Sequence, residues 1–293
     1  MVRKLANAMK INPKKFHKDQ WKFHLVLTII SIFMALPIIF IFNHAFKPFT
    51  ELFAYPPRFF VREPTLENFR LLFNFSAESG IPLSRYLFNS LFVTVTVILL
   101  TLLISSLAAF ALSKLNFKGK ETFNKINTLA LMFVPVAVAI PRFFIIVNLG
   151  IFNTYLAHII PMLAMPIGIF LLKQFMDQIP NELLEAAKMD GASNWRVYWN
   201  VILPLVKPAL VTVAILTFQA SWGNVESSNI FMDKESIRTL PFYLNTLVSQ
   251  SGNIVAGAGL SAVAGLIMFV PNLILFIILQ NKVMNSMAHT GIK

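Results

Sequence analysis

The sequence predicts an all-α, polytopic membrane protein with six transmembrane helices and with both termini in the cytoplasm. Of its 293 residues, 56% are hydrophobic and only 13% are charged, and the mean hydropathy is +0.68. A soluble core could not bury so much apolar surface, so the expected solvent is a bilayer. Backbone polar groups in lipid must be satisfied within the spanning segment itself, which predicts that the spans are helices.

Six segments are apolar enough to cross a bilayer. A transmembrane α-helix needs about 20 apolar residues to span a hydrocarbon core of about 30 Å. The first segment contains Pro37, lacks an A-x-A cleavage pattern and is too long for the core of a signal peptide, so we expect it to be retained. The six segments are residues 23–46, 86–112, 126–148, 154–176, 208–224 and 257–281.

The basic residues predict the topology of the chain. A formal net charge of +12 would suit a nucleic-acid binder only if the basic residues were clustered on a solvated domain. They lie instead in short runs between the apolar segments, so we expect no nucleic-acid partner. By the positive-inside rule, the basic residues of segments 1–22 and 114–125, together with Lys282 and Lys293, mark the cytoplasmic side. Residues 1–22 would thus form a cytoplasmic segment, and residues 23–293 a transmembrane domain.

Residues 47–85 would then lie on the outer side of the membrane. The arginines of this loop are offset by four glutamates, and long loops contribute less to the positive-inside rule. Within the loop, Pro64 and Thr65 precede the apolar-periodic run "LENFRLLF". This pattern predicts a short helix at the outer surface.

Residues 177–207 are the polar segment that this topology assigns to the cytoplasm, and they predict two short helices. The first would begin at Pro180, whose fixed φ suits the first helical position, with Lys188 near the negative end of the helix dipole. The dipeptide Asp190-Gly191 would end this helix, because glycine freely adopts the left-handed conformation of a helix C-cap.

The second helix of this hairpin carries aromatic side chains. Ser193 is a good N-cap, and Pro204 and Pro208 mark the return to the fifth span. Two interpretations stay open from the residues alone: a docking surface for a partner, or a hairpin whose aromatic side chains lie at the level of the lipid headgroups. An apolar face at spacings of i, i+3, i+4 and i+7 is formed by Trp195, Tyr198, Trp199 and Ile202.

The hairpin resembles the EAA loop of the permease subunits of ABC importers. That pattern is EAA, three residues, Gly, nine residues and I-x-L-P, and "EAAKMDGASNWRVYWNVILPLVKP" follows it with Val201 at the Ile position. The wider chain is similar to sugar-importer permeases of the maltose type, in "NSLFVTVTV", "SSLAAFALSK" and "IFLLKQF" and in "KPF", "YPP" and "TLENF". The EAA positions in register are Glu185, Ala186, Ala187, Gly191, Leu203 and Pro204.

The resemblance implies a coupling role for the hairpin. In that family it docks in a cleft of a separate ATPase subunit, which would make Glu185 the charged contact to the ATPase. Ala186 and Ala187 would allow close approach, and Asp190-Gly191 would shape the turn. The implied partners are an ATPase dimer that binds ATP and magnesium, a second and related permease, and an extracytoplasmic solute-binding protein. The implied location is the cytoplasmic membrane of a bacterium or archaeon, with several membrane passes.

The implied function is that of a permease subunit that forms half of a path for a carbohydrate, with an oligosaccharide favoured. The alternatives are a permease for another solute, such as an amino acid or phosphate, and a membrane scaffold or enzyme without a transport role. A secondary transporter is disfavoured, because the predicted spans lack acidic residues for proton coupling.

The motifs of an enzyme are missing from the sequence. It has no G-x-x-x-x-G-K-[ST] motif, and "FKGKET" lacks both the first Gly and the Ser or Thr after Lys. It has no Cys, and its five His residues are scattered without ligand spacing. We therefore expect no catalytic residue, no metal site and no cofactor in this chain, with ATP and magnesium bound by the partner.

Polar residues within spans are costly and are therefore candidates for the solute path. Trp222 is included because an aromatic face can stack on a sugar ring, although a Trp at the membrane interface is equally ordinary. Gly223 and the polar run "VESSN" depart from the family pattern and could reshape the outer mouth. The candidates for the path are Arg142, Asn148, Gln219, Trp222 and Asn224.

Small residues four positions apart predict helix contact faces in membranes. One such face is formed by Gly257, Ser261 and Gly265, and another by Ser105, Ala109 and Ser113. They would pack either within this chain or against a second permease subunit.

Overall fold

The structure is a computed structural model that describes residues 21–78, 80–133, 135–250 and 254–290. Most of the predicted cytoplasmic segment 1–22 and the tail residue Lys293 lie outside the described residues. The described residues form helices, turns and irregular connections without any strand, so the predicted all-α fold is confirmed. The orientation of the termini stays a prediction.

Three described helices are long and apolar enough to cross a membrane. They are α2 (Trp21–Ala45), α5 (Leu83–Lys114) and the Gly257–Gln280 part of α16 (Ile254–Thr290), and they correspond to the first, second and sixth predicted spans. Two bent helix pairs raise this number to five if each pair is one span. The chain is therefore a polytopic membrane protein, as predicted.

The bent pairs correspond to the fourth and fifth predicted spans. Helices α8 (Tyr155–Leu163) and α9 (Pro166–Asp177) meet at 42°, where the ring and missing N–H of Pro166 interrupt the helical hydrogen bonds. Helix α13 (Lys207–Trp222) makes an angle of 79° with the helical segment Asn194–Leu205 that precedes it. That sharp angle separates the hairpin from the fifth span.

The third predicted span, residues 126–148, is not one helix. It is divided into α6 (Lys120–Ala130), the 3₁₀ turn η2 (Pro135–Val138) and α7 (Ala139–Asn148). Pro135 lacks the N–H that a continuous helix needs, which accounts for the break. Apolar composition alone predicted a continuous span here, and that prediction is wrong. The region contains two helices, α6 and α7, separated by the 3₁₀ turn.

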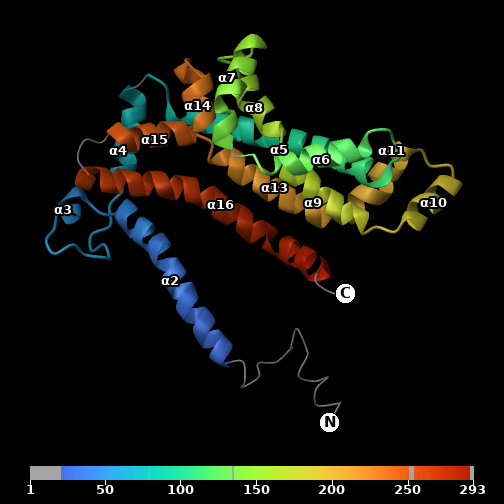
Figure 1. The fold of residues 1–293 in the computed structure, drawn as a ribbon. Helices are drawn as coiled ribbons and strands as arrows, with labels where there is room; N and C mark the ends of the chain where they lie inside the picture. Colours follow the sequence, from blue (N-terminus) through green and yellow to red (C-terminus); the bar gives the residue numbers. More distant parts are fainter. Residues whose placement is uncertain (1–20, 79, 134, 251–253, 291–293) are drawn as a thin grey trace.

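Helix α5 is the central element of the fold. It packs against α9, α13, α8 and α15 (Leu240–Gln250) along its length. Figure 1 shows α10 (Asn181–Met189) and α11 (Asn194–Val197) at one end of this bundle, with α7, α14 (Glu226–Phe231) and α15 toward the other. We call these the hairpin end and the distal end. Helices α16 and α2 lie along one side (Figure 1), with α16 packed on α13 and α2 packed on α16.

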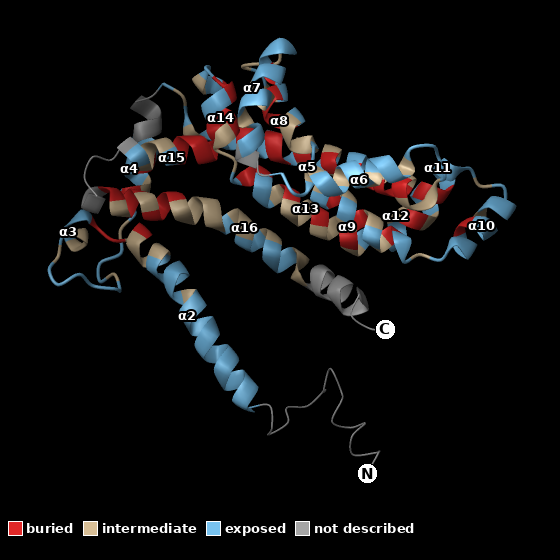
Figure 2. Ribbon diagram, viewed as in Figure 1, coloured by how far each residue is buried: buried red, intermediate tan, exposed pale blue. Residues whose placement is uncertain are grey.

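Burial is concentrated in two clusters, one near each end of the bundle (Figure 2). At the hairpin end, Leu172 and Met176 of α9 pack with Ala109 of α5 and with residues of the hairpin. At the distal end, Tyr86 of α5 packs with Trp222 and with residues of α15 and α16. Helix α2 is exposed over nearly its whole length, and Figure 2 shows this as an almost uniform pale ribbon.

The connection between α2 and α5 is ordered by side chains that cap its backbone. It contains α3 (Phe49–Leu52) and α4 (Glu67–Glu78), and α4 confirms the short helix predicted after Thr65. The carboxylate of Glu51 accepts hydrogen bonds from the backbone N–H groups of Glu63 and Arg62, at 2.9 and 3.2 Å. These bonds lower the pKa of Glu51, because they stabilise its charged form.

Asn68 joins three elements at the distal end. It is buried on α4, and its amide Nδ2 donates to the carbonyl oxygens of Ala45, the last residue of α2, and of Lys47 in the connection that follows. Gly259 of α16 lies against the same amide: a Cβ at this position would approach Asn68 Oδ1 to 2.6 Å. The close contact therefore requires glycine at position 259.

We expect Gly259→Ala to destabilise the protein by about 1–3 kcal/mol, because a methyl group would displace the Asn68 amide from its two carbonyl partners. The measurement is thermal unfolding of the full chain in detergent. The matched control is Gly265→Ala on the same helix, where the nearest atom to a new Cβ is Ile41 Cγ2 at an ordinary 3.7 Å. Equal melting temperatures for the two variants would contradict the prediction.

Candidate functional site

The hairpin forms two short helices with the predicted capping. Helix α10 follows Pro180, which lies one position earlier than predicted, at the N-cap. Gly191 adopts a left-handed φ of 79° after α10, and the Ser193 side chain accepts a hydrogen bond from the Arg196 N–H at the start of α11. The end of the first helix at Gly191 and the start of the second helix at Ser193 are therefore where the sequence predicted them.

The second helix departs from the predicted regular pattern. After α11 the chain forms a π-helical turn, η3 (Tyr198–Ile202), followed by α12 (Leu203–Leu205). Tyr198 and Ile202 are buried, whereas Trp195 and Trp199 are 59% and 42% exposed. The predicted aromatic face is therefore divided into an anchoring half and an exposed half. The exposed half borders a hollow of about 400 Å³ that also includes Gly191 and Arg196.

Tyr198 anchors the hairpin to the central helix. Its hydroxyl and that of Ser106 on α5 share a buried hydrogen bond of 2.7 Å, and its ring packs against Phe110 of α5. Leu184 of α10 and Ile202 of the π turn belong to the same buried cluster. A neutral buried hydrogen bond contributes about 1 kcal/mol, so the apolar cluster provides most of the attachment and the hydroxyl pair fixes its geometry.

Polar contacts attach the start of the hairpin to the end of α5. Lys114 Nζ donates to the carbonyl of Ile179 at 2.6 Å and to Asn181 Oδ1 at 3.1 Å. Ser113 donates to Asp177 at 2.6 Å, and Asp177 also pairs with Lys173 at 2.7 Å. These contacts and the Tyr198 anchor join both arms of the hairpin to α5, so the hairpin and this end of α5 form one packed unit.

The EAA positions lie mainly on the free face of this unit. Glu185 and Ala186 are exposed on α10, while Ala187 is half-buried and contacts the cluster beneath. Asp190 and Gly191 form the exposed turn, and no atom lies within 4 Å of a Cβ built on Gly191. Farther along, Leu203 is half-buried and Pro204 is exposed. The hairpin therefore presents a carboxylate beside small residues, with its apolar side turned into the bundle.

At the distal end, Arg142 has a partner that the sequence did not identify. Its guanidinium on α7 forms an ion pair with Glu226 of α14 and lies 6.0 Å from the centre of the Phe231 ring. A charge within a membrane-spanning region needs such a partner, because desolvation without one is costly. The pair joins the broken third span to the polar segment that follows α13.

That segment, residues 224–239, is held by a set of hydrogen bonds that we call the distal network. His158 of α8 is buried, and its Nδ1 lies 2.8 Å from Ser227 Oγ and its Nε2 3.1 Å from the Ile237 carbonyl. A carbonyl only accepts, so Nε2 carries the proton and Nδ1 accepts from the serine. Both ring nitrogens of His158 therefore have hydrogen-bond partners within the chain.

The end of α5 completes the distal network. Asn89 Nδ2 donates to the carbonyls of Ser236 and Arg238, at 3.0 and 2.7 Å, while its Oδ1 accepts from Tyr155 at 2.7 Å. The hydroxyl of Tyr86 donates to Glu235 at 2.8 Å. The sequence analysis missed these residues of α5. The sequence does contain a signal for these residues, because polar side chains within an apolar span predict buried hydrogen-bond partners.

The other candidates for the solute path lie in different surroundings. Asn148 and Gln219 are exposed. Asn224 accepts from the N–H of Ser227 at 2.9 Å, which caps the start of α14. Trp222 is 2% exposed and stacks on Phe218, with its Nε1 3.3 Å from the Met268 carbonyl. Its ring has no free face for a sugar in this structure, and a role for these residues in the path stays a prediction.

The small-residue faces make contacts inside the chain. Ser105 and Ala109 are buried on α5, and Ser105 Oγ approaches the position of a Cβ on Gly168 of α9 to 3.3 Å. Gly265 of α16 lies against Ile41 of α2. Within the described ranges, no group of three or more His, Asp or Glu side chains is arranged to hold a metal ion.

The fold defines the chain as an all-α, multi-pass membrane protein with a packed polar hairpin at one end. Residues 14–283 match the family described as binding-protein-dependent transport system inner membrane component, and the chain belongs to this family. It is therefore a transport permease subunit of the inner membrane.

Similar proteins agree with this assignment. The chain is 30% identical to an inner membrane ABC transporter permease protein, YcjP, of Escherichia coli, with 92% of this chain and 95% of that protein covered. It is 29% identical to the arabinooligosaccharides transport system permease protein AraQ of Halalkalibacterium halodurans, with coverage of 93% and 96%. The fold is similar to a chain of a bacterial ABC transporter involved in the import of the acidic polysaccharide alginate, at a TM-score of 0.76 and 22% identity, with coverage of 92% and 99%.

The Arg142–Glu226 pair can be tested by exchanging its charges. We expect Arg142→Glu to lower both the melting temperature and solute uptake, because two carboxylates would face each other. The double variant Arg142→Glu with Glu226→Arg restores the opposite charges and should recover most of both properties. Uptake in membrane vesicles and thermal unfolding are measured together. Recovery of the melting temperature without uptake would show that Arg142 does more than pair with Glu226.

Proposed function

We propose that this chain is one of two permease subunits of an ATP-driven importer and that it forms half of the path for a carbohydrate. Its hairpin would be the attachment for a separate ATPase. The observation that carries this proposal is the construction of the hairpin: the exposed Glu185 and Ala186 lie on a unit whose opposite face is packed and hydrogen-bonded to α5. Such a unit would move together with α5, because its packed face is attached to that helix.

The exposed face of α10 suits docking on another protein. A carboxylate gives a directional, charge-assisted contact to a basic group of a partner, and small neighbouring residues allow the two surfaces to approach closely. Displacement of α10 would reach α5 through the Tyr198–Ser106 bond and through Lys114, which holds the start of the hairpin. Because α5 also carries Asn89 of the distal network, the same helix connects both ends of the bundle.

The energy for transport would come from the partner. The sequence contains no phosphate-binding P-loop, so we assign ATP and magnesium to the ATPase dimer and no cofactor to this chain. ATP would favour one of two conformations by its differential affinity for them, and the hairpin would pass this preference to the membrane helices. This assignment requires the hairpin to be cytoplasmic, as the basic residues predict.

The carbohydrate class rests on the similarity of the whole chain to sugar-transport permeases such as the arabinooligosaccharide permease, and an oligosaccharide is favoured. A solute-binding protein outside the membrane would deliver the sugar, and a second, related permease would complete the path. Amino acids and phosphate are the alternative solutes. A scaffold without transport activity is disfavoured by the family of the chain.

We expect Glu185→Lys to abolish ATP-driven uptake while the chain still inserts in the membrane, because a reversed charge would repel the basic group of the ATPase. Uptake and co-purification of the ATPase are measured in the assembled transporter. Glu121→Lys is the matched control, since Glu121 is also exposed but lies on α6 and not on the hairpin. Normal uptake and normal co-purification of the Glu185→Lys variant would refute the coupling role.

The solute class is tested by uptake in vesicles supplied with the solute-binding protein that belongs to this transporter. We expect labelled oligosaccharides, but not amino acids or phosphate, to accumulate in an ATP-dependent manner. Accumulation of an amino acid or phosphate would replace the carbohydrate assignment and leave the coupling role intact. Uptake that is driven by an ion gradient and is indifferent to ATP would reject the importer mechanism itself.

A further inference from the structure

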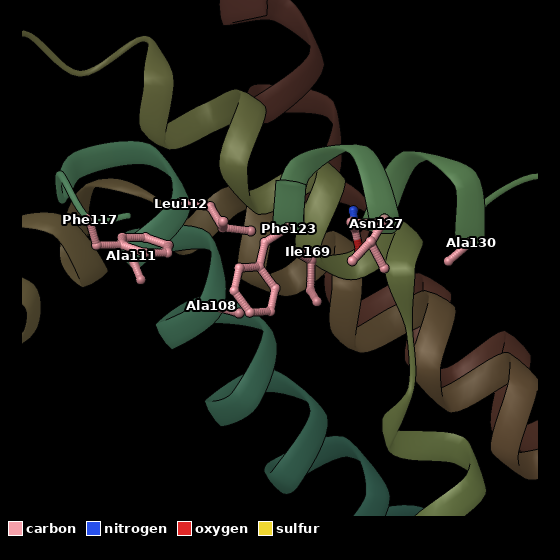
Figure 3. A pocket seen from close by; sticks show the side chains of 9 residues that line it. Ala108, Ala111, Leu112, Phe117, Phe123, Asn127, Ala130 and Ile169 are labelled. Atoms are coloured by element: carbon pink, nitrogen blue, oxygen red, sulfur yellow. The ribbon is translucent and has the colours of Figure 1, made fainter. Parts of the chain in front are cut away.

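Two adjoining hollows lie where α5, α6 and α9 approach the hairpin, and the proposed transport function uses neither. The first has a volume of about 420 Å³ and is lined almost wholly by apolar atoms. Figure 3 shows Phe123 of α6 directed toward Ala108 of α5, with Ile169 of α9 beside the ring. In a membrane protein such a hollow is suited to a hydrocarbon chain.

The second hollow has a volume of about 620 Å³ and is polar and basic. Two residues, Ala111 and Phe117, line both hollows, so the apolar hollow and the basic hollow adjoin each other. The second hollow is lined by Lys114 at the end of α5 and by Lys188 on α10, together with Asn116 and Asn194. Its other lining atoms belong to Leu115.

The basic groups of this hollow are not neutralised by ion pairs. Among the described residues, neither Lys114 nor Lys188 lies within ion-pair distance of a carboxylate. Lys114 uses two of its N–H groups on Ile179 and Asn181, and the third is available to another acceptor. Two carboxylates, Asp177 and Glu182, attract Lys114 from beyond ion-pair distance, and Asp177 is already paired with Lys173. The two lysines of the hollow therefore form no ion pair among the described residues.

The two hollows follow a change in side-chain character at the end of α5. The apolar run of α5 ends at Leu112, and the basic residues of segment 114–125 begin immediately after it. This change from apolar to basic side chains corresponds to the boundary between hydrocarbon and headgroups. An occupant of both hollows needs a hydrocarbon tail on one side of Phe117 and an anionic group on the other.

We propose that the two hollows form a binding site for an anionic phospholipid of the leaflet on the hairpin side. One acyl chain occupies the apolar hollow along Phe123 and Ile169, and the phosphate accepts hydrogen bonds from Lys114 and Lys188. Basic pockets between transmembrane helices on the cytoplasmic side bind anionic headgroups in this manner. A soluble anion would fill only the basic hollow, and an apolar helix of another subunit would offer no anionic group to the two lysines.

The bound lipid would connect the hairpin to the bundle independently of the solute that is carried. Its phosphate would link Lys188 of α10 to Lys114 of α5, and its acyl chain would pack between α5, α6 and α9. Anionic lipid should therefore stabilise the folded chain, since a ligand that binds the native state and not the unfolded state shifts the unfolding equilibrium.

Native mass spectrometry of the full chain in a mild detergent tests the site. The purified protein is titrated with dioleoyl phosphatidylglycerol, with dioleoyl phosphatidylcholine and with glycerol phosphate. We expect phosphatidylglycerol to bind more tightly than phosphatidylcholine, and Lys188→Gln to weaken its binding about fivefold, as the loss of one lysine contact near a membrane surface predicts. Ala108→Phe, which fills the apolar hollow, should weaken phosphatidylglycerol at least as much. The control is Lys207→Gln, an exposed lysine that lines neither hollow.

Lys188 is exposed, so its variant reports on binding even if Ala108→Phe impairs folding, which is checked by its melting temperature without lipid. Equal binding of the two phospholipids would overturn the proposal. An equal loss of binding in Lys188→Gln and Lys207→Gln would also overturn it, by assigning the attraction to general surface charge. Binding of glycerol phosphate as tight as that of phosphatidylglycerol would replace the lipid by a soluble anion.

Discussion

The structure depends on helix α5, whose middle lies in hydrocarbon. The polar side chains at its two ends need hydrogen-bond partners from other segments. At the distal end, Asn89 supplies three hydrogen bonds to other segments, and at the hairpin end Ser106 and Lys114 bond the hairpin. In an apolar bundle these groups have few alternatives, since an unpaired polar group in a water-free region is costly. The partners of α5 are thereby fixed, and the helix becomes the common support for both ends.

The hairpin and the distal segment 224–239 are attached to the bundle by different interactions. The hairpin is held chiefly by apolar packing, with few polar contacts at its base, and it keeps one face free. The distal segment 224–239 is held by hydrogen bonds from α5 and α8 and by the Arg142–Glu226 pair. An element that must move as a unit benefits from the first arrangement. A segment that crosses the bundle with many polar groups requires the second, because each group needs its own partner.

The sequence was sufficient to predict the features that depend on neighbouring residues. Apolar length predicted the positions of α2, α5 and α16, and the φ requirement at Gly191 and the cap at Ser193 predicted the limits of the hairpin helices. It was insufficient to predict hydrogen bonds whose partners lie far away along the chain. The sequence shows that Asn89 is a polar residue in an apolar run, but its acceptors lie about 150 residues later, on a segment whose path depends on the whole fold. Pro135 can be seen in the sequence and indicates a break in the helix. The prediction of a continuous span relied on the apolar composition of the segment and not on the missing N–H of this proline.

Helix α2 packs on α16, and contacts to the connection that follows it involve Phe40 and Asn43, while residues 21–34 are all exposed. The first half of α2 is therefore held by few contacts within this chain. Tilt in such a case is set by membrane thickness and by adjacent molecules. The same sequence would thus hold α2 at different angles in thin and thick membranes, while the bundle around α5 kept its internal geometry.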